Sequence, residues 1–124
     1  MLAKNVTATL VIRALRGDPD SFKKLVQAHL RAAYSVALAI LGRPADAEDI
    51  AQDSFLIAFE RLDTCREPER FAGWLLQIVR NQARNALVSR RLRDQTASIG
   101  QAPWRVMTRS GRSEMLWMAR LKAR

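Results

Sequence analysis

The chain has 124 residues, 48% of them hydrophobic, which is enough for one domain with a buried core. It contains one cysteine and one histidine, so neither an internal disulfide nor a His/Cys metal site can form. No apolar run approaches the roughly 20 residues of a membrane span, and residues 1–9 lack a signal-peptide pattern. Motifs of serine hydrolases, P-loop proteins and zinc proteases are also missing. We therefore expect a cytoplasmic, non-enzymatic protein that uses no cofactor and no metal.

The net charge of +9 is distributed unevenly along the chain. Residues 1–45 sum to +5, residues 46–69 sum to −6, residues 70–93 carry six arginines and no acid, and residues 94–124 sum to +4. An acidic block next to a wholly basic one indicates two different partners, one of them polyanionic. The alternative is that ordinary solvated faces happen to segregate.

Helix boundaries are marked clearly in the first part of the chain. Residues 10–16 form the end of a short first helix that stops at Gly17. Asp18 and Pro19 then supply a side-chain cap and a proline at the first helical position of a second helix, which Gly42 ends. Three- and four-residue spacing of apolar side chains predicts that this helix is amphipathic. These positions are Phe22, Leu25, Val26, His29, Ala33, Val36, Ala37 and Ile40.

Two more helices follow. Pro44 opens the third, with acidic residues in its first turns, where the helix dipole favours negative charge, and it reaches about Leu62. Residues 63–68 are predicted to form a loop. The fourth helix opens at Pro68 and reaches about Arg93.

No alternating pattern predicts a β-strand. We therefore predict an all-α domain, a compact bundle of about four helices spanning residues 1–93. From residue 94 onward the composition changes, and residues 94–124 are predicted to be an irregular basic tail. Residues 113–122 could form one short helix within it.

The predicted third helix has two faces. A broad apolar face suits the core. The opposite face is an acidic stripe with a leucine in its middle. Its members are Asp49, Gln52, Asp53, Leu56 and Glu60. A leucine on such a face favours a protein contact, although single exposed leucines are common.

The predicted fourth helix has an apolar side and a basic one. Gln77, Arg80, Arg84 and Arg91 form a stripe on the far side, flanked by Arg70 and Asn81. Phosphates would relieve the repulsion between these cations, and Gln, Arg and Asn can also hydrogen-bond base edges. The alternative is a basic helix that only promotes solubility. Trp74 lies at the edge of the apolar side, where it is either a core residue or a stacking platform for unpaired bases.

Two segments of the chain resemble one known family. Residues 46–55 (DAEDIAQDSF) and 71–81 (FAGWLLQIVRN) are similar to the first conserved domain of extracytoplasmic-function sigma factors of the sigma-70 family. Residues 16–22 (RGDPDSF) and 41–46 (LGRPAD) also resemble that family. The similarity covers about residues 10–93, which corresponds to sigma region 2.

The resemblance implies a role for each stripe. In this family the acidic helix docks on the clamp coiled-coil of the polymerase β′ subunit. The following loop, here residues 64–69, captures a base flipped out of the promoter −10 element, and the last helix contacts the non-template strand of that element. The polymerase-binding residues would be Asp49, Gln52, Asp53 and Leu56. The DNA-binding residues would be Thr64, Arg66, Arg70, Trp74, Gln77, Arg80, Asn81, Arg84 and Arg91. The expected function is recognition and melting of the −10 element in transcription initiation, and an anti-sigma factor is a further partner that the resemblance allows.

Two departures from the family pattern stand out. Cys65 occupies the loop position before Arg66, where an aromatic residue is common. The residues after Arg93 contain no counterpart of the family's second domain, which reads the −35 element. One alternative function is therefore a shortened sigma-like protein that occupies core polymerase or an anti-sigma factor without initiating transcription. Another is a general basic helical DNA binder that ignores polymerase.

Overall fold

The computed structural model describes residues 3–96, which form four α-helices, two short 3₁₀ helices and no strand. The elements are α1 (Lys4–Leu15), α2 (Pro19–Leu41), α3 (Pro44–Glu60), η1 (Leu62–Thr64), η2 (Pro68–Arg70) and α4 (Phe71–Thr96). The prediction of an all-α bundle is confirmed for this part of the chain. The predicted tail from residue 97 onward, with the short helix at 113–122, lies outside the described residues.

The residues that begin and end α2 are as predicted. Asp18 Oδ1 accepts a hydrogen bond from the Asp20 amide at 3.1 Å, and Oδ2 accepts one from Ser21 Oγ at 2.7 Å. The Ser21 hydroxyl is the main reason that the pKa of Asp18 lies below its usual value. At the other end Gly42 adopts a left-handed conformation (φ +74°), and its amide donates to the Leu38 carbonyl at 2.8 Å.

Some predicted boundaries were wrong by a few residues. α3 ends at Glu60, and Leu62 belongs to η1. Pro68 opens η2, and α4 begins only at Phe71 and runs to Thr96, past the predicted end at Arg93. The proline locks its own φ, which starts a helical turn, but here that turn is a separate 3₁₀ turn.

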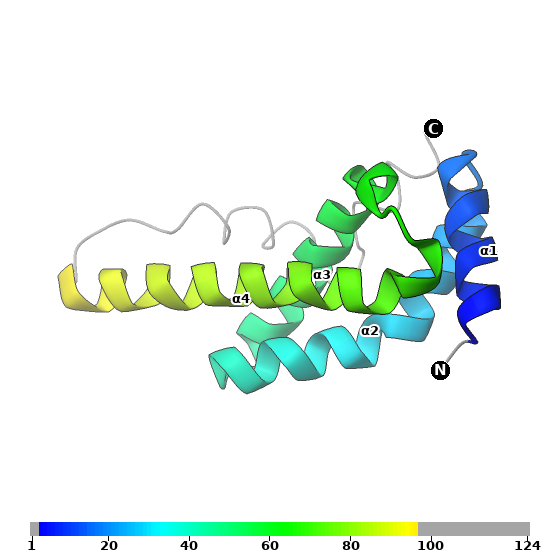
Figure 1. The fold of residues 1–124 in the computed structure, drawn as a ribbon. Helices are drawn as coiled ribbons and strands as arrows, with labels where there is room; N and C mark the ends of the chain where they lie inside the picture. The colour runs from blue at the N-terminus through cyan, green and yellow to red at the C-terminus, as the bar shows by residue number, and fades with distance from the viewer. Residues whose placement is uncertain (1–2, 97–124) are drawn as a thin grey trace.

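Helix α2 is the centre of the bundle and packs against α1, α3 and α4. α3 also packs on α4, so these three helices enclose the main core, while α1 covers one end (Figure 1). The largest fully buried side chains include Phe22, Phe55 and Phe71, one from each of α2, α3 and α4. Burial of such aromatic side chains supplies most of the free energy of helix association.

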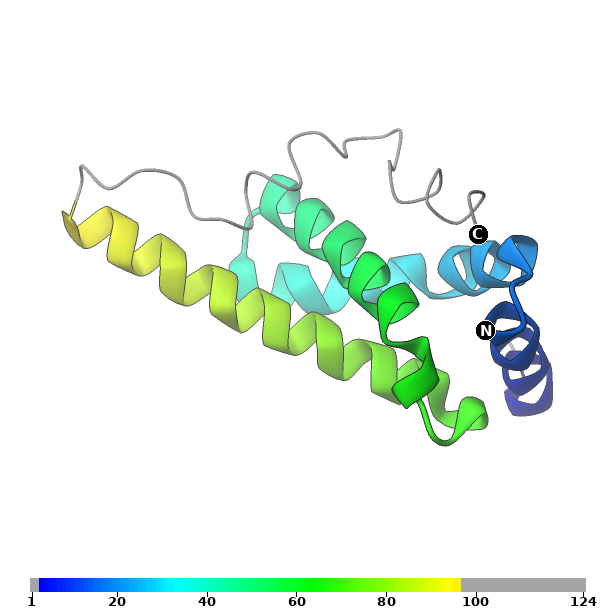
Figure 2. The same ribbon diagram turned by 90° about the horizontal axis from the view of Figure 1, so that it is seen from above.

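Two features of the arrangement matter for function. The far end of α4 projects beyond the ends of α2 and α3 in both views (Figures 1 and 2). At its near end, η2 packs against α1, so the loop between α3 and α4 is held against the first helix. Cys65 is buried within that loop, and burial raises the pKa of its thiol.

Candidate nucleic-acid and protein interfaces

The polar stripe of α4 is present in the structure. Gln77, Asn81, Arg84 and Arg91 are exposed and Arg80 is half-buried. Gln77 Nε2 donates a hydrogen bond to Asn81 Oδ1 at 3.2 Å, which holds the two amides side by side. Among residues 3–96, no carboxylate pairs with any of the three arginines of this stripe. The stripe is therefore an uncompensated basic surface with amide groups in its middle.

Arg90 faces the other way and is part of the fold. Its Nη1 lies 3.1 Å from Asp46 Oδ2, and its Nη2 donates to the Leu41 carbonyl at 3.0 Å. Both side chains of this ion pair are largely buried, at 13% and 10% exposed. Arg90 thus ties α4 to the junction of α2 and α3. Sequence reasoning missed this pair, because Arg90 is one of six arginines in residues 70–93 and nothing local distinguishes it.

Trp74 lies at the edge of the core, as predicted. Its ring is half-buried, and its centroid lies 5.7 Å from that of Phe71 at a tilt of 41°. One side of the indole is thus supported by the core while part of it stays accessible. This geometry suits a stacking platform next to the polar stripe.

The loop before α4 exposes its predicted DNA-binding side chains. Thr64 and Arg66 are exposed, and Thr64 Oγ1 donates to the Arg61 carbonyl at 2.7 Å. Arg70 is exposed and lies 3.5 Å from a Glu67 carboxylate oxygen, a pair that solvent screens strongly. Arg70 directly precedes the first turn of α4.

Two apolar side chains on α4 were missed by the sequence reasoning. Val88 and Leu92 are 54% and 56% exposed, four residues apart on the projecting part of the helix. They lie among the arginines of the stripe. The signal that could have found them is their position away from the apolar side of the helix.

The acidic stripe of α3 is less exposed than the sequence predicted. Gln52 and Asp53 are buried, at 7% and 9% exposed, and Leu56 is half-buried and packed against the core. Asp49 is half-buried and Glu60 is exposed. The prediction of a solvent-facing leucine was therefore wrong, because neighbouring helices bury a larger part of the α3 circumference than the helical wheel assigned to the core.

Burial gives Asp53 unusual electrostatics. Removal from solvent, and next the charge of Asp49, raise the pKa of Asp53 to about 7. Among residues 3–96 no hydrogen-bond donor or cation partners its carboxylate. Within the described part of the chain Asp53 and Arg84 do not form an ion pair with each other.

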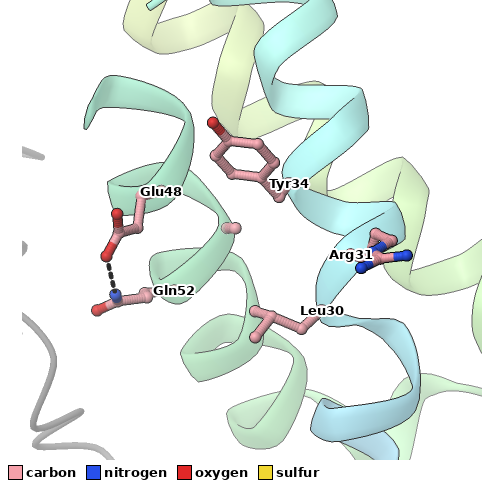
Figure 3. A pocket seen from close by; sticks show the side chains of 6 residues that line it. Leu30, Arg31, Tyr34, Glu48 and Gln52 are labelled. Atoms are coloured by element: carbon pink, nitrogen blue, oxygen red, sulfur yellow. Dashed lines mark hydrogen bonds between the residues drawn. The ribbon is translucent and has the colours of Figure 1, made fainter. Parts of the chain in front are cut away.

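A groove of about 430 Å³ lies beside this face, between α2 and α3. Leu30 and Tyr34 extend from α2 toward Glu48 and Gln52 on α3, whereas Arg31 is directed away from α3 (Figure 3). Gln52 Nε2 is 3.5 Å from Glu48 Oε1. The groove thus combines apolar and polar groups at the edge of the predicted docking face.

The described residues contain no cluster of three or more His, Cys, Asp and Glu side chains that could hold a metal ion. Within residues 3–96, none of the helices combines the length and apolar character that a membrane-spanning segment requires.

Comparison with known families gives one match over more than half of the chain. A family model described as Sigma-70 region 2 matches residues 25–93. The matched segment begins in the first half of α2 and ends near the end of α4, so it includes the acidic helix, the loop and the basic stripe.

Individual relatives agree with this match. A probable RNA polymerase sigma factor, RfaY, of Xanthomonas campestris is 41% identical over 80 residues, which are 64% of this chain and 20% of the relative. The RNA polymerase sigma factor NccH of Alcaligenes xylosoxydans is 34% identical over 93 residues, 75% of this chain and 50% of the relative. In Bacillus subtilis the ECF RNA polymerase sigma factor SigW is 33% identical over 66 residues, 53% of this chain and 35% of the relative. The chain thus spans between a fifth and half of the length of these relatives. No solved structure matches it significantly.

Proposed function

Because the chain belongs to the sigma-70 family of RNA polymerase sigma factors, as a region 2 domain of the extracytoplasmic-function type, we propose that it docks on core RNA polymerase through α3 and holds the unpaired −10 strand of a promoter along α4. The domain makes and breaks no covalent bond in this role. It lowers the free energy of open DNA by binding the single strand better than the duplex.

The observation that carries the DNA part is the composition of the α4 surface. Arg80, Arg84 and Arg91 have no acidic partner among residues 3–96, and the Gln77–Asn81 pair and the half-buried Trp74 ring lie beside them. Cations attract the phosphates, amides hydrogen-bond base edges, and the indole stacks on a base. Opening DNA costs on the order of 1.4 kcal/mol per stacked step. Stacking that is worth about 1–3 kcal/mol per base, together with phosphate contacts, offsets that cost.

The polymerase part rests on the α3 face. Asp53 is a buried carboxylate that has no cationic partner among residues 3–96. It lies next to Asp49 and follows Gln52, which lines the α2–α3 groove. A basic helix of the β′ clamp would supply the missing positive charge, and side chains of that helix could enter the groove. In this proposal Asp49, Gln52, Asp53 and Leu56 contact the clamp. Gln52 is reached from the groove that it lines, and Leu56 through the part of its side chain that is accessible.

The DNA part is tested with Arg84→Gln. We expect the variant to bind a single-stranded −10 oligonucleotide more weakly, with a slope of log affinity against log salt that is smaller by about 0.7, the value for one lost phosphate contact. Arg43→Gln is the matched control, because Arg43 is an exposed arginine at the start of α3, away from the stripe. A slope that is the same in both variants would remove Arg84 from the interface.

The polymerase part is tested with Asp49→Arg. We expect this charge reversal to abolish co-purification with core polymerase while the circular dichroism spectrum is unchanged. Asp63→Arg makes the same change in η1, off the α3 face, and should leave binding intact. Equal pull-down of both variants would contradict the docking face. If the wild-type chain binds core polymerase but not the −10 strand, the alternative is favoured, in which the protein occupies polymerase without initiating transcription. The same alternative is favoured if the chain and core polymerase give no abortive transcripts from a template already opened at the −10 region.

A further inference from the structure

The groove between α2 and α3 combines apolar walls with negative charge. Leu30 and Tyr34 of α2 face Glu48 of α3 across it, and its volume is about 430 Å³ (Figure 3). That volume lies within the range of sites that hold small organic molecules, roughly 300–1,000 Å³, so one large side chain fits. Helix α3 carries five acidic residues and no basic one, and of these Asp46 pairs with Arg90 inside the fold. An occupant with a large apolar side chain and positive charge therefore suits the groove.

Residues 113–124, which lie outside the described part of the chain, have this composition. Their sequence, SEMLWMARLKAR, contains five large apolar residues, three bases and one acid. Leu121 follows Trp117 by four residues, so the two fall on one side of a helix. Arg120 and Arg124 follow Trp117 by three and seven residues and fall on the same side. Segments with anchors at this spacing bind apolar grooves as amphipathic helices.

The segment can reach the groove from the end of α4. Arg90 Nη1 lies 3.1 Å from Asp46 Oδ2, which brings the last turns of α4 to the start of α3. Thr96, the last residue of α4, follows Arg90 by six residues, which is about 9 Å of helix. Gln52 in the groove wall follows Asp46 by the same number. The 16 residues 97–112 span about 50 Å when extended, which is enough to bring residue 113 to the groove.

We propose that residues 113–124 bind in the α2–α3 groove of their own chain, with Trp117 against Leu30 and Tyr34 and the arginines toward the acidic residues of α3. The segment then covers the face on which polymerase docks in the proposed function. Polymerase has to displace it, so the chain inhibits its own docking. The competition rests on the proposed function, whereas the contact within the chain does not.

Tethering makes such a contact effective although the segment is short. A flexible linker of this kind gives an effective concentration on the order of 1 mM. A segment whose affinity as a free peptide is about 0.1 mM then occupies the groove about nine-tenths of the time. The apparent affinity for a competitor falls in proportion to the fraction of open chains, which is about tenfold.

The contact is tested by photo-crosslinking in the full chain. Tyr34 is replaced by p-benzoylphenylalanine, which keeps an aromatic ring in the groove wall, and the dilute protein is irradiated. We expect mass spectrometry of the monomer to find cross-links from position 34 to residues 113–124. The same photoreactive amino acid in place of Ala39, which is exposed on α2 and does not line the groove, should give none.

Two tryptophan variants connect the contact to polymerase binding. Trp117→Ala removes the anchor and should abolish the cross-links from position 34. Trp104→Ala is the matched control, because it removes the same side chain from the residues that precede the segment, and it should leave the cross-links intact. The same variants without the photoreactive group are titrated with core RNA polymerase. We expect Trp117→Ala to bind about tenfold more tightly than the wild type, and Trp104→Ala to bind as the wild type does.

The two measurements separate the inference from the proposed function. Cross-links that Trp117→Ala abolishes, together with its tighter binding to polymerase, support the inference. No cross-links to residues 113–124, or cross-links only between two copies of the chain, would overturn it and leave the proposed function standing. Cross-links with equal polymerase affinity in the wild type and both variants would overturn the competition. If the cross-links form but neither the wild type nor a variant binds polymerase, the contact within the chain stands and the polymerase part of the proposed function fails.

Discussion

Replacement of Asp53 by asparagine removes a buried negative charge that destabilises the folded domain. The carboxylate is buried, has no cationic partner among residues 3–96, and lies next to Asp49. Asn has nearly the same shape and remains neutral at every pH. We therefore expect Asp53→Asn to stabilise the domain at neutral and alkaline pH.

The magnitude and its pH dependence follow from the raised pKa. The pKa of Asp53 rises from the ordinary 3.8 to about 7, and a difference of about three corresponds to about 4 kcal/mol as an upper limit. Between pH 4 and 7 the folded state holds a proton that the unfolded state has released, so the free energy of unfolding falls as the pH rises through this window. Below pH 4 the carboxyl is neutral in both states and the variant gains nothing. Above pH 7 the gain is complete.

Urea denaturation at intervals from pH 4 to 8 measures this directly. The unfolding free energy of the wild type should decline over the window relative to that of Asp53→Asn, with the two curves meeting near pH 4. Asp63→Asn is the control, because Asp63 is exposed in η1 and its replacement should leave the curve parallel to the wild type. Parallel curves for Asp53→Asn and the wild type, or a less stable Asp53→Asn at pH 8, would refute the electrostatic reasoning.

Two further predictions concern the fold. Arg90→Ala leaves Asp46 buried without its cation and should lower the free energy of unfolding by about 3 kcal/mol. Urea denaturation of Arg90→Ala, Asp46→Ala and the double variant should give a coupling free energy above about 1 kcal/mol. Additive effects of the two substitutions would contradict the ion pair. Gly42→Ala should lower the unfolding free energy by about 1 kcal/mol, because φ is +74° and the added Cβ meets no neighbour. Gly73→Ala, in a helix and equally unobstructed, should not lower it, so equal losses at both glycines would show that backbone conformation is not the cause.

Most of the fold could be predicted because its signals are local. Asp18, Pro19 and Gly42 set the ends of α2 through their own conformations and hydrogen bonds. Apolar side chains at helical spacing showed which side of α2 and α4 is buried. The short turn η2 was not predicted, because Pro68 is compatible with either a 3₁₀ turn or the first turn of a longer helix. In the structure the 3₁₀ turn forms, and it contacts α1 and α4.

Candidate site residues could be predicted only where the periodicity of a single helix decides whether a side chain is exposed. The α4 stripe is such a case, because α4 turns one side to the core, and Gln77, Asn81, Arg84 and Arg91 on its other side are exposed. The burial of Gln52 and Asp53 on α3 and the inward turn of Arg90 depend on how separate helices cross, which a single-helix wheel does not contain.

Both proposed surfaces leave the isolated domain with charge that it does not compensate. Arg84 and Arg91 are exposed cations on one side of α4, and Asp53 is buried with no cation beside it among residues 3–96. Pairing them within the chain would make the domain more stable but would remove the charges that partners need. The largely buried Arg90–Asp46 pair lies where α4 meets the α2–α3 junction, and it ties α4 to that junction. Ion pairing in this domain therefore stabilises the position of α4, while the cations of its outer side remain available to a polyanion.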